Sequence, residues 1–142
     1  MASNQYPTVP FDVSKHPAIA IVEQIYKKYF EKNIEGILVY LTDDVQWNCN
    51  AAKEKCPIAG RYTGHDGVRE YFKKDFEEIS NSMTIQNYKH TENGTCVYVN
   101  GVCTYTVKAT GKTFDGSWEH LFELENGKIK KLDMMIHIEC IN

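Results

Sequence analysis

The chain has 142 residues, of which 42% are hydrophobic and 25% charged, and its formal net charge is −3. This size and composition are typical of one globular domain and not of a disordered chain. Lysines and arginines are scattered among acidic residues and form no basic stripe, which argues against a nucleic-acid partner. Because no apolar stretch could cross a bilayer and no signal-peptide core is present, we expect no membrane partner and a cytoplasmic location.

The five cysteines predict reduced thiols. Their number is odd, and no two of them have the C-x-x-C spacing of redox or zinc motifs. The five histidines are too dispersed to form a metal signature such as H-E-x-x-H. We therefore expect neither a metal nor a cofactor.

The N-terminal half is predicted to be helical after a short arm. Residues 1–15 are polar and contain two prolines, so we expect an arm there and a single domain over residues 16–142. Apolar side chains at spacings of three and four predict a helix from about Ala18 to Asn33, with Pro17 in its first turn and Ser14 or His16 as its cap. A shorter helix should follow, with Ile34, Ile37, Leu38 and Leu41 turned inward.

A short strand and a third helix come next. Val45–Asn50 alternates as a strand with Val45, Trp47 and Cys49 on one side, and the stretch from Ala51 to Gly64 is expected to be irregular. The third helix should begin near His65 or Asp66, and its charged residues from Arg69 to Glu78 are expected to face solvent. Its buried stripe is predicted to comprise Val68, Phe72, Phe76 and Ile79.

After Ser82 the hydrophobic period changes from that of a helix to that of a strand. Asn93-Gly94 and Asn126-Gly127 predict turns, and Asn100-Gly101 predicts a bulge or bend within one long strand. The fold class is therefore α+β, with three helices followed by an antiparallel meander to which the early strand is added. The predicted meander strands are Met83–Thr91, Thr95–Lys108, Thr113–Leu124 and Lys128–Glu139.

Both faces of the last two strands are partly apolar, whereas a sheet with water on one side should alternate more cleanly. We therefore expect one face to cover the helices and a pocket, and the outer sheet face to form a homodimer. His120 and His137 are assigned to that outer face. Trp118, Phe122 and Met135 are the apolar residues expected to serve there.

Several segments together resemble a known family. Gly36–Trp47, Gly60–Phe72 and the meander ending Asn126–Ile129 are similar to the SnoaL-like branch of the nuclear transport factor 2-like superfamily, which also contains ketosteroid isomerase. The resemblance spans roughly Ile19 to Ile138. It implies a cone-shaped fold in which a strongly curved mixed or antiparallel sheet wraps around three N-terminal helices and encloses a pocket.

The resemblance also implies candidate catalytic residues. In ketosteroid isomerase a carboxylate base moves a proton, while a tyrosine and a neutral carboxylic acid stabilise the oxyanion. Tyr26 matches the position of that tyrosine and Glu119 that of the acid, but the position of the base is occupied by Cys49. The sequence does not indicate which residue replaces the base. The pocket is expected to be lined by Tyr29, Trp47, Cys49, Phe72, Leu121, Leu132, Met134 and Ile136.

Three functions are compatible with these features, because this fold hosts both enzymes and binding proteins. The first is a cofactor-independent isomerase, cyclase or lyase acting on a small hydrophobic, oxygenated molecule. The second is a non-catalytic carrier of such a molecule, favoured by the missing base and by the apolar row from Leu132 to Ile138. The third is a protein-interaction adaptor that uses the sheet face.

Overall fold

The computed structural model describes residues 16–140, so the expected arm at residues 1–15 lies outside the described residues. Within the described range the chain forms three helices and six strands. In chain order they are α1 (Pro17–Phe30), α2 (Ile34–Leu38), β1 (Leu41–Asn50), β2 (Gly60–Thr63), α3 (Gly64–Glu78), β3 (Ile79–His90), β4 (Cys96–Val107), β5 (Thr113–Glu125) and β6 (Lys128–Cys140).

Local chemistry explains where the first two helices begin. His16 caps α1, since its Nδ1 accepts a hydrogen bond from the backbone N–H of Ala18 at 3.0 Å, and Pro17 occupies the first turn. Asn33 caps α2 through the N–H of Gly36 at 2.9 Å. The second helix is shorter than expected, because Leu41 already pairs with β6 as the start of β1.

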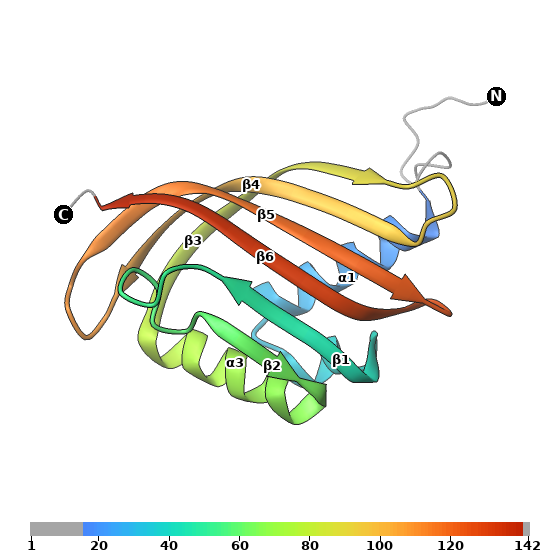
Figure 1. Ribbon diagram of the computed structural model, residues 1–142, viewed down its shortest axis with the longest axis horizontal. Coiled ribbons are helices and arrows are strands. Elements are labelled where there is room, and N and C mark those ends of the chain that lie inside the picture. Colours follow the sequence, from blue (N-terminus) through green and yellow to red (C-terminus); the bar gives the residue numbers. More distant parts are fainter. Residues whose placement is uncertain (1–15, 141–142) are drawn as a thin grey trace.

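The strands form one mixed sheet in the order β2-β1-β6-β5-β4-β3. Only the β1–β6 pair is parallel among the strand pairs of the described range. The expectation that the whole stretch from Ala51 to Gly64 is irregular is wrong. The four residues of β2 lie in it and pair with Gln46–Cys49 of β1. The long curved sheet with α3 beneath it is visible in Figure 1. The α+β cone implied by the resemblance is thus confirmed.

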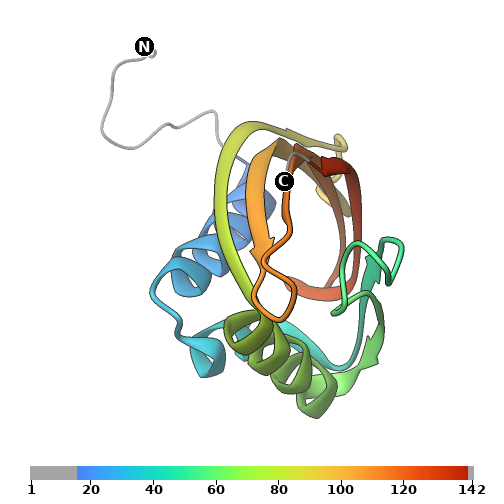
Figure 2. The ribbon, with the colours of Figure 1, turned by 90° about the vertical axis from the view of Figure 1, so that its left-hand side faces the viewer.

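A β-bulge lies where the sequence predicts a bulge or bend in the sheet. Between β3 and β4, Ile85 pairs with Gly101 and Asn87 with Asn100, so Gln86 is the extra residue of a bulge on β3. A Cβ on Gly101 would overlap the carbonyl oxygen of Thr84 and lie 2.6 Å from the Trp118 ring. Figure 2 shows the long strands bent into an arch with α1 and α3 packed beside it.

The hydrophobic core lies between the concave face of this sheet and the helices. Its largest fully buried side chains include Trp47, Phe122, Ile37, Leu41 and Leu132. On α3, Val68 and Phe72 are buried as expected, and Tyr71 and Asp75 are buried with them. In residues 16–140, no helix is both long and apolar enough to span a membrane.

Candidate functional site

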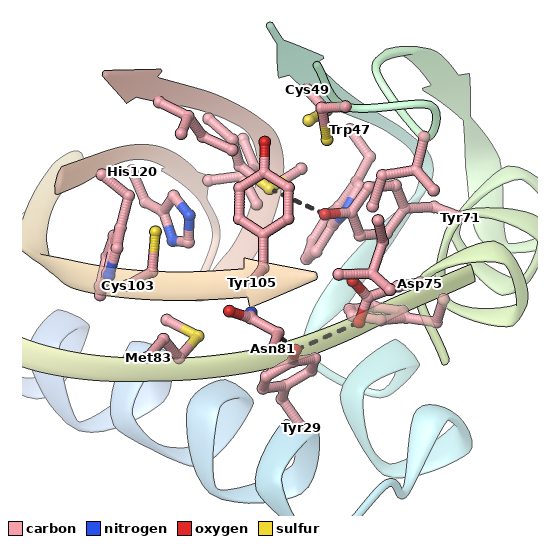
Figure 3. Close-up of a pocket in the computed structure, with 18 of the residues that line it drawn as sticks. Tyr29, Trp47, Cys49, Tyr71, Asp75, Asn81, Met83, Cys103, Tyr105 and His120 are labelled. Atoms are coloured by element: carbon pink, nitrogen blue, oxygen red, sulfur yellow. Dashed lines mark hydrogen bonds between the residues drawn. The ribbon is translucent and has the colours of Figure 1, made fainter. Parts of the chain in front are cut away.

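A cavity of about 100 Å³ lies between the concave face of the sheet and the helices α1 and α3. It is mainly apolar, with polar groups at a few points of its wall (Figure 3). Eight of the residues singled out from the sequence line it: Tyr26, Tyr29, Trp47, Cys49, Phe72, Leu132, Met134 and Ile136.

Two of the expected site residues do not line the cavity, and their assumed orientation is wrong. Glu119 and Leu121 are on the convex side of β5, while Trp118, His120 and Phe122 face the cavity instead of a partner. The physical reason is the pairing of Trp118 with Gly101 on β4, because only a residue without a side chain leaves room for the indole. Since strand residues alternate, Glu119 must then point away.

On the convex face Glu119 has a partner of its own. Its Oε2 lies 3.2 Å from Nε2 of His137, and the Glu119 side chain is 34% exposed. A carboxylate in that position cannot polarise an oxygen atom held inside the cavity. The two residues that the resemblance matched are therefore not brought together, and only Tyr26 reaches the cavity.

The carboxylate that does line the cavity is Asp75, on α3. The hydroxyl of Tyr29, on α1, donates a hydrogen bond to its Oδ2 at 3.1 Å, and Asn81 Nδ2 donates to that hydroxyl at 3.4 Å. Figure 3 shows these three side chains gathered on one side of the cavity. Asn81 is exposed, so the wall of the cavity reaches the protein surface at this side.

The surroundings of Asp75 perturb its proton affinity. Burial raises its pKa from 3.8 to about 6, against the lowering effects of the Tyr29 hydrogen bond and the charge of Lys108. A carboxyl with this pKa is ionised at neutral pH, yet it holds a proton far more readily than an exposed aspartate does. Such a value suits a group that must take a proton and return it near pH 7.

A second polar group faces the cavity from the side opposite Asp75 (Figure 3). The hydroxyl of Tyr26 lies 2.6 Å from Nδ1 of His120. Burial lowers the pKa of His120 to about 3 and raises that of Tyr26, so both groups are neutral at pH 7. The two groups carry two exchangeable protons and share one of them in their mutual hydrogen bond. The other proton, on Tyr26 or on His120, remains as a donor.

Trp47 contributes a second donor. Its side chain lines the cavity, and its Nε1 is buried with no hydrogen-bond partner among the described residues. Leaving a buried N–H unpaired costs about 1–3 kcal/mol. An acceptor atom of a bound molecule would satisfy this group, whereas an entirely apolar ligand would not.

Thiols occupy the remaining polar part of the wall. Cys49 lies where the resemblance implies a base, and it donates a hydrogen bond to the sulfur of Cys56. Both are free cysteines, as is Cys103, which also lines the cavity. Over the range that the structure describes, no group of three or more His, Cys, Asp or Glu side chains is placed to hold a metal ion.

Asp75 and His120 are the residues that reasoning from sequence missed. Asp75 belongs to a run of mixed charges that was assigned to solvent, but it follows Val68 by seven residues and Phe72 by three. That spacing places it in the apolar stripe of α3 and was the available signal. His120 lies on the same face of β5 as Trp118 and Phe122, so its orientation depended on which face of β5 is concave.

Comparisons with known proteins agree with this architecture. The chain resembles an NTF2-like protein of unknown function from Burkholderia pseudomallei K96243, with 18% identity over 87% of this chain and 92% of that one and a TM-score of 0.76. It also resembles TerC crystallised with polyporic acid, with 20% identity over 86% of this chain and 92% of that one and a TM-score of 0.73. A third similar structure is an LEH-like epoxide hydrolase from M. tuberculosis, with 13% identity, coverage of 85% and 83%, and a TM-score of 0.65. At these identities the likeness concerns the fold.

The sequence was also compared with curated proteins and with known protein families. No curated protein matches the chain. Residues 22–132 match the SnoaL-like domain, a span that runs from within α1 to the first residues of β6 and contains α2, α3 and β1–β5. The chain therefore belongs to the SnoaL-like domain family.

Proposed function

We propose that the chain binds a small, mainly apolar molecule carrying an oxygen function and moves a proton on it without a cofactor, as an isomerase, cyclase or lyase. The observation that carries this proposal is Asp75, a buried carboxyl on the cavity wall whose pKa is raised to about 6. Asp75 would act as the base that the resemblance had placed at Cys49. The Tyr29 hydroxyl steadies its ionised form.

The donors of the cavity suit the other half of such a reaction. When a proton leaves the carbon next to a carbonyl group, negative charge develops on the carbonyl oxygen and must be stabilised by hydrogen bonds. The Tyr26–His120 pair and the N–H of Trp47 are neutral donors in an apolar surrounding. In such a surrounding a hydrogen bond to a charged oxygen is stronger than in water.

The size of the cavity limits the ligand. An apolar protein cavity of about 150 Å³ accommodates benzene, and this cavity is about 100 Å³. It therefore suits a molecule smaller than benzene, such as a short branched chain. A lipid-sized ligand would require the wall to move.

Exchange of carbon-bound hydrogen tests the proposal without knowledge of the natural substrate. Acetone, a small ketone, is incubated with the protein in D₂O, and deuterium uptake next to the carbonyl is followed by NMR. We expect the protein to accelerate uptake and Asp75→Asn to lower the rate by about 100-fold or more, in the range of general-base catalysis. Glu77→Gln, an exposed change on the same helix, is the matched control. Equal rates for Asp75→Asn and the unmodified protein contradict the proposal.

A second candidate function is a non-catalytic carrier. The row Leu132, Met134 and Ile136 supports it, because these side chains give the β6 wall no group that could react. The same experiment separates the two candidates. Saturable binding of acetone with no enhanced deuterium uptake favours the carrier.

We further propose a cytoplasmic homodimer. Four described cysteines are free, which supports a reducing compartment. On the convex face of β5 and β6, Leu121 and Met135 are half-buried in the isolated chain and present apolar surface to a second copy. Trp118 and Phe122 no longer belong to this surface, since both are buried against the cavity.

A further inference from the structure

Two thiols lie side by side in the cavity wall. Cys49 is near the end of β1 and Cys56 is in the loop that follows, and each is 3% exposed. The thiol of Cys49 donates a hydrogen bond to the sulfur of Cys56. The loop turns back on itself to bring them together, since the N–H of Cys56 donates to the carbonyl of Ala52 at 2.8 Å. Figure 3 shows Cys49 at the edge of the cavity.

The two thiols have different electrostatic surroundings. The sulfur of Cys56 accepts hydrogen bonds from Cys49 and from the backbone N–H groups of Ile58 and Ala59, which together lower its pKa although burial acts in the opposite direction. The pKa of Cys49 is raised, chiefly because it donates to Cys56 and because it is buried. Cys56 is thus the nucleophile of the pair, and Cys49 remains a thiol beside it.

We propose that Cys49 and Cys56 form a redox-active dithiol that reduces a small hydroperoxide entering the cavity. The sulfur of Cys56 attacks the terminal peroxide oxygen, the O–O bond breaks, and the leaving alkoxide takes up the proton given up by the Cys56 thiol. The sulfur of Cys49 then attacks the sulfenic acid of Cys56 and expels water, which leaves a disulfide. In sum, two thiols and one hydroperoxide give one disulfide, one alcohol and one water molecule.

The geometry of the cavity selects the oxidant. A volume of about 100 Å³ admits hydrogen peroxide or a short alkyl hydroperoxide, whereas a peptide disulfide such as oxidised glutathione is too large to reach the buried sulfur of Cys56. The opening beside the exposed Asn81 gives small molecules access to the wall.

The loop around Cys56 is anchored but is free to adjust. The hydroxyls of Tyr105 and Tyr62 donate to the carbonyls of Lys55 and Ile58 at 3.0 and 2.8 Å and hold the loop on both sides of Cys56. Residues 52–55 are exposed and bury nothing that a shift would uncover. Closing two hydrogen-bonded sulfurs to a disulfide distance of about 2.05 Å needs a movement of this loop only.

Mass spectrometry tests the pair directly. The reduced native protein is treated with hydrogen peroxide, alkylated with N-ethylmaleimide and digested with trypsin without reductant. We expect a cross-link between the tryptic peptides spanning 33–53 and 56–61, which contain Cys49 and Cys56, and its loss on treatment with dithiothreitol. Cys103→Ser should still give the cross-link, and in Cys49→Ser the sulfenic acid of Cys56 should be trapped by dimedone.

The oxidation rates of Cys56 and Cys103 can be compared within the same protein. Burial raises the pKa of Cys103, on the same cavity, to about 11, whereas hydrogen bonds to its sulfur lower the pKa of Cys56. Cys56 therefore has the larger thiolate fraction, and we expect it to be oxidised faster than Cys103. Three outcomes overturn the proposal: a cross-link to Cys103 or Cys96, faster oxidation of Cys103, or alkylation of both Cys49 and Cys56 after peroxide treatment.

The redox pair is independent of proton transfer. Asp75→Asn should lower the rate of deuterium exchange by about 100-fold or more and still form the Cys49–Cys56 cross-link, because its amide leaves both sulfurs in place. Failure of one of the two activities therefore leaves the other open to its own test. Loss of the cross-link in Asp75→Asn, when circular dichroism shows an unchanged fold, would contradict the separate roles.

Discussion

Replacing Asp75 by asparagine should stabilise the folded protein at neutral pH. Asp75 is 6% exposed, and burial raises its pKa from 3.8 to about 6. Between these two values the folded chain keeps a proton that the unfolded chain releases, so the free energy of unfolding falls as the pH rises through this window. A gap of about two pKa units, at about 1.4 kcal/mol for each, makes the loss about 3 kcal/mol. Asparagine has no proton to lose and can still accept the Tyr29 hydrogen bond.

Urea unfolding at about pH 4 and about pH 7.5 measures this effect. We expect the variant and the unmodified protein to have similar free energies of unfolding at the lower pH, where the carboxyl of Asp75 is protonated. At the higher pH the variant should be more stable by about 3 kcal/mol. Glu77→Gln removes an exposed carboxyl from the same helix and should show no comparable pH dependence. A difference that is equal at both pH values, or an Asp75→Asn variant less stable at about pH 7.5, would refute the reasoning.

Three further predictions follow from the orientation of β5 and β6. Glu119→Gln, on the convex face, should change stability by less than about 0.5 kcal/mol and leave deuterium exchange unaltered; a large loss of exchange would restore Glu119 as a catalytic residue. The imidazole of His120, whose pKa burial lowers to about 3, should remain neutral from about pH 8 to about pH 5, and an NMR resonance of its ring that moves over this range would be inconsistent with burial. Sedimentation velocity should give twice the mass of a single chain, and Leu121→Glu should convert the protein to monomer; a monomer without the substitution would exclude the proposed interface.

Elements that rest on local chemistry could be predicted from the sequence. Pro17 and His16 begin α1 as expected, and Asn126 and Gly127 adopt the left-handed conformations of a tight hairpin turn, with φ of 52° and 79°. β2 could not be predicted, because its four residues form a strand only through pairing with β1. A segment of that length has no period of its own.

The site was only partly predictable for a reason of geometry. Alternation along β6 correctly groups Leu132, Met134 and Ile136 on one wall of the cavity. Along β5 it separates Trp118 from Glu119 equally well, but it does not say which of the two faces is concave, since both carry apolar residues. That choice is made by Gly101 on the neighbouring strand, which leaves room for the Trp118 ring.

The unfavourable burial of two polar groups in the cavity wall supports the proposal that the cavity binds a ligand. Asp75 and Trp47 both lower the stability of the empty protein, the first because its charge is poorly solvated and the second because its N–H is unpaired. Packing does not require the carboxyl of Asp75, since asparagine has nearly the same shape and would avoid the first cost. Such groups are expected at a ligand site, because an oxygenated molecule bound beside them could relieve both costs. Under the proposed function the base comes from Asp75 on α3, which leaves the strand position of Cys49 on β1 free for other chemistry.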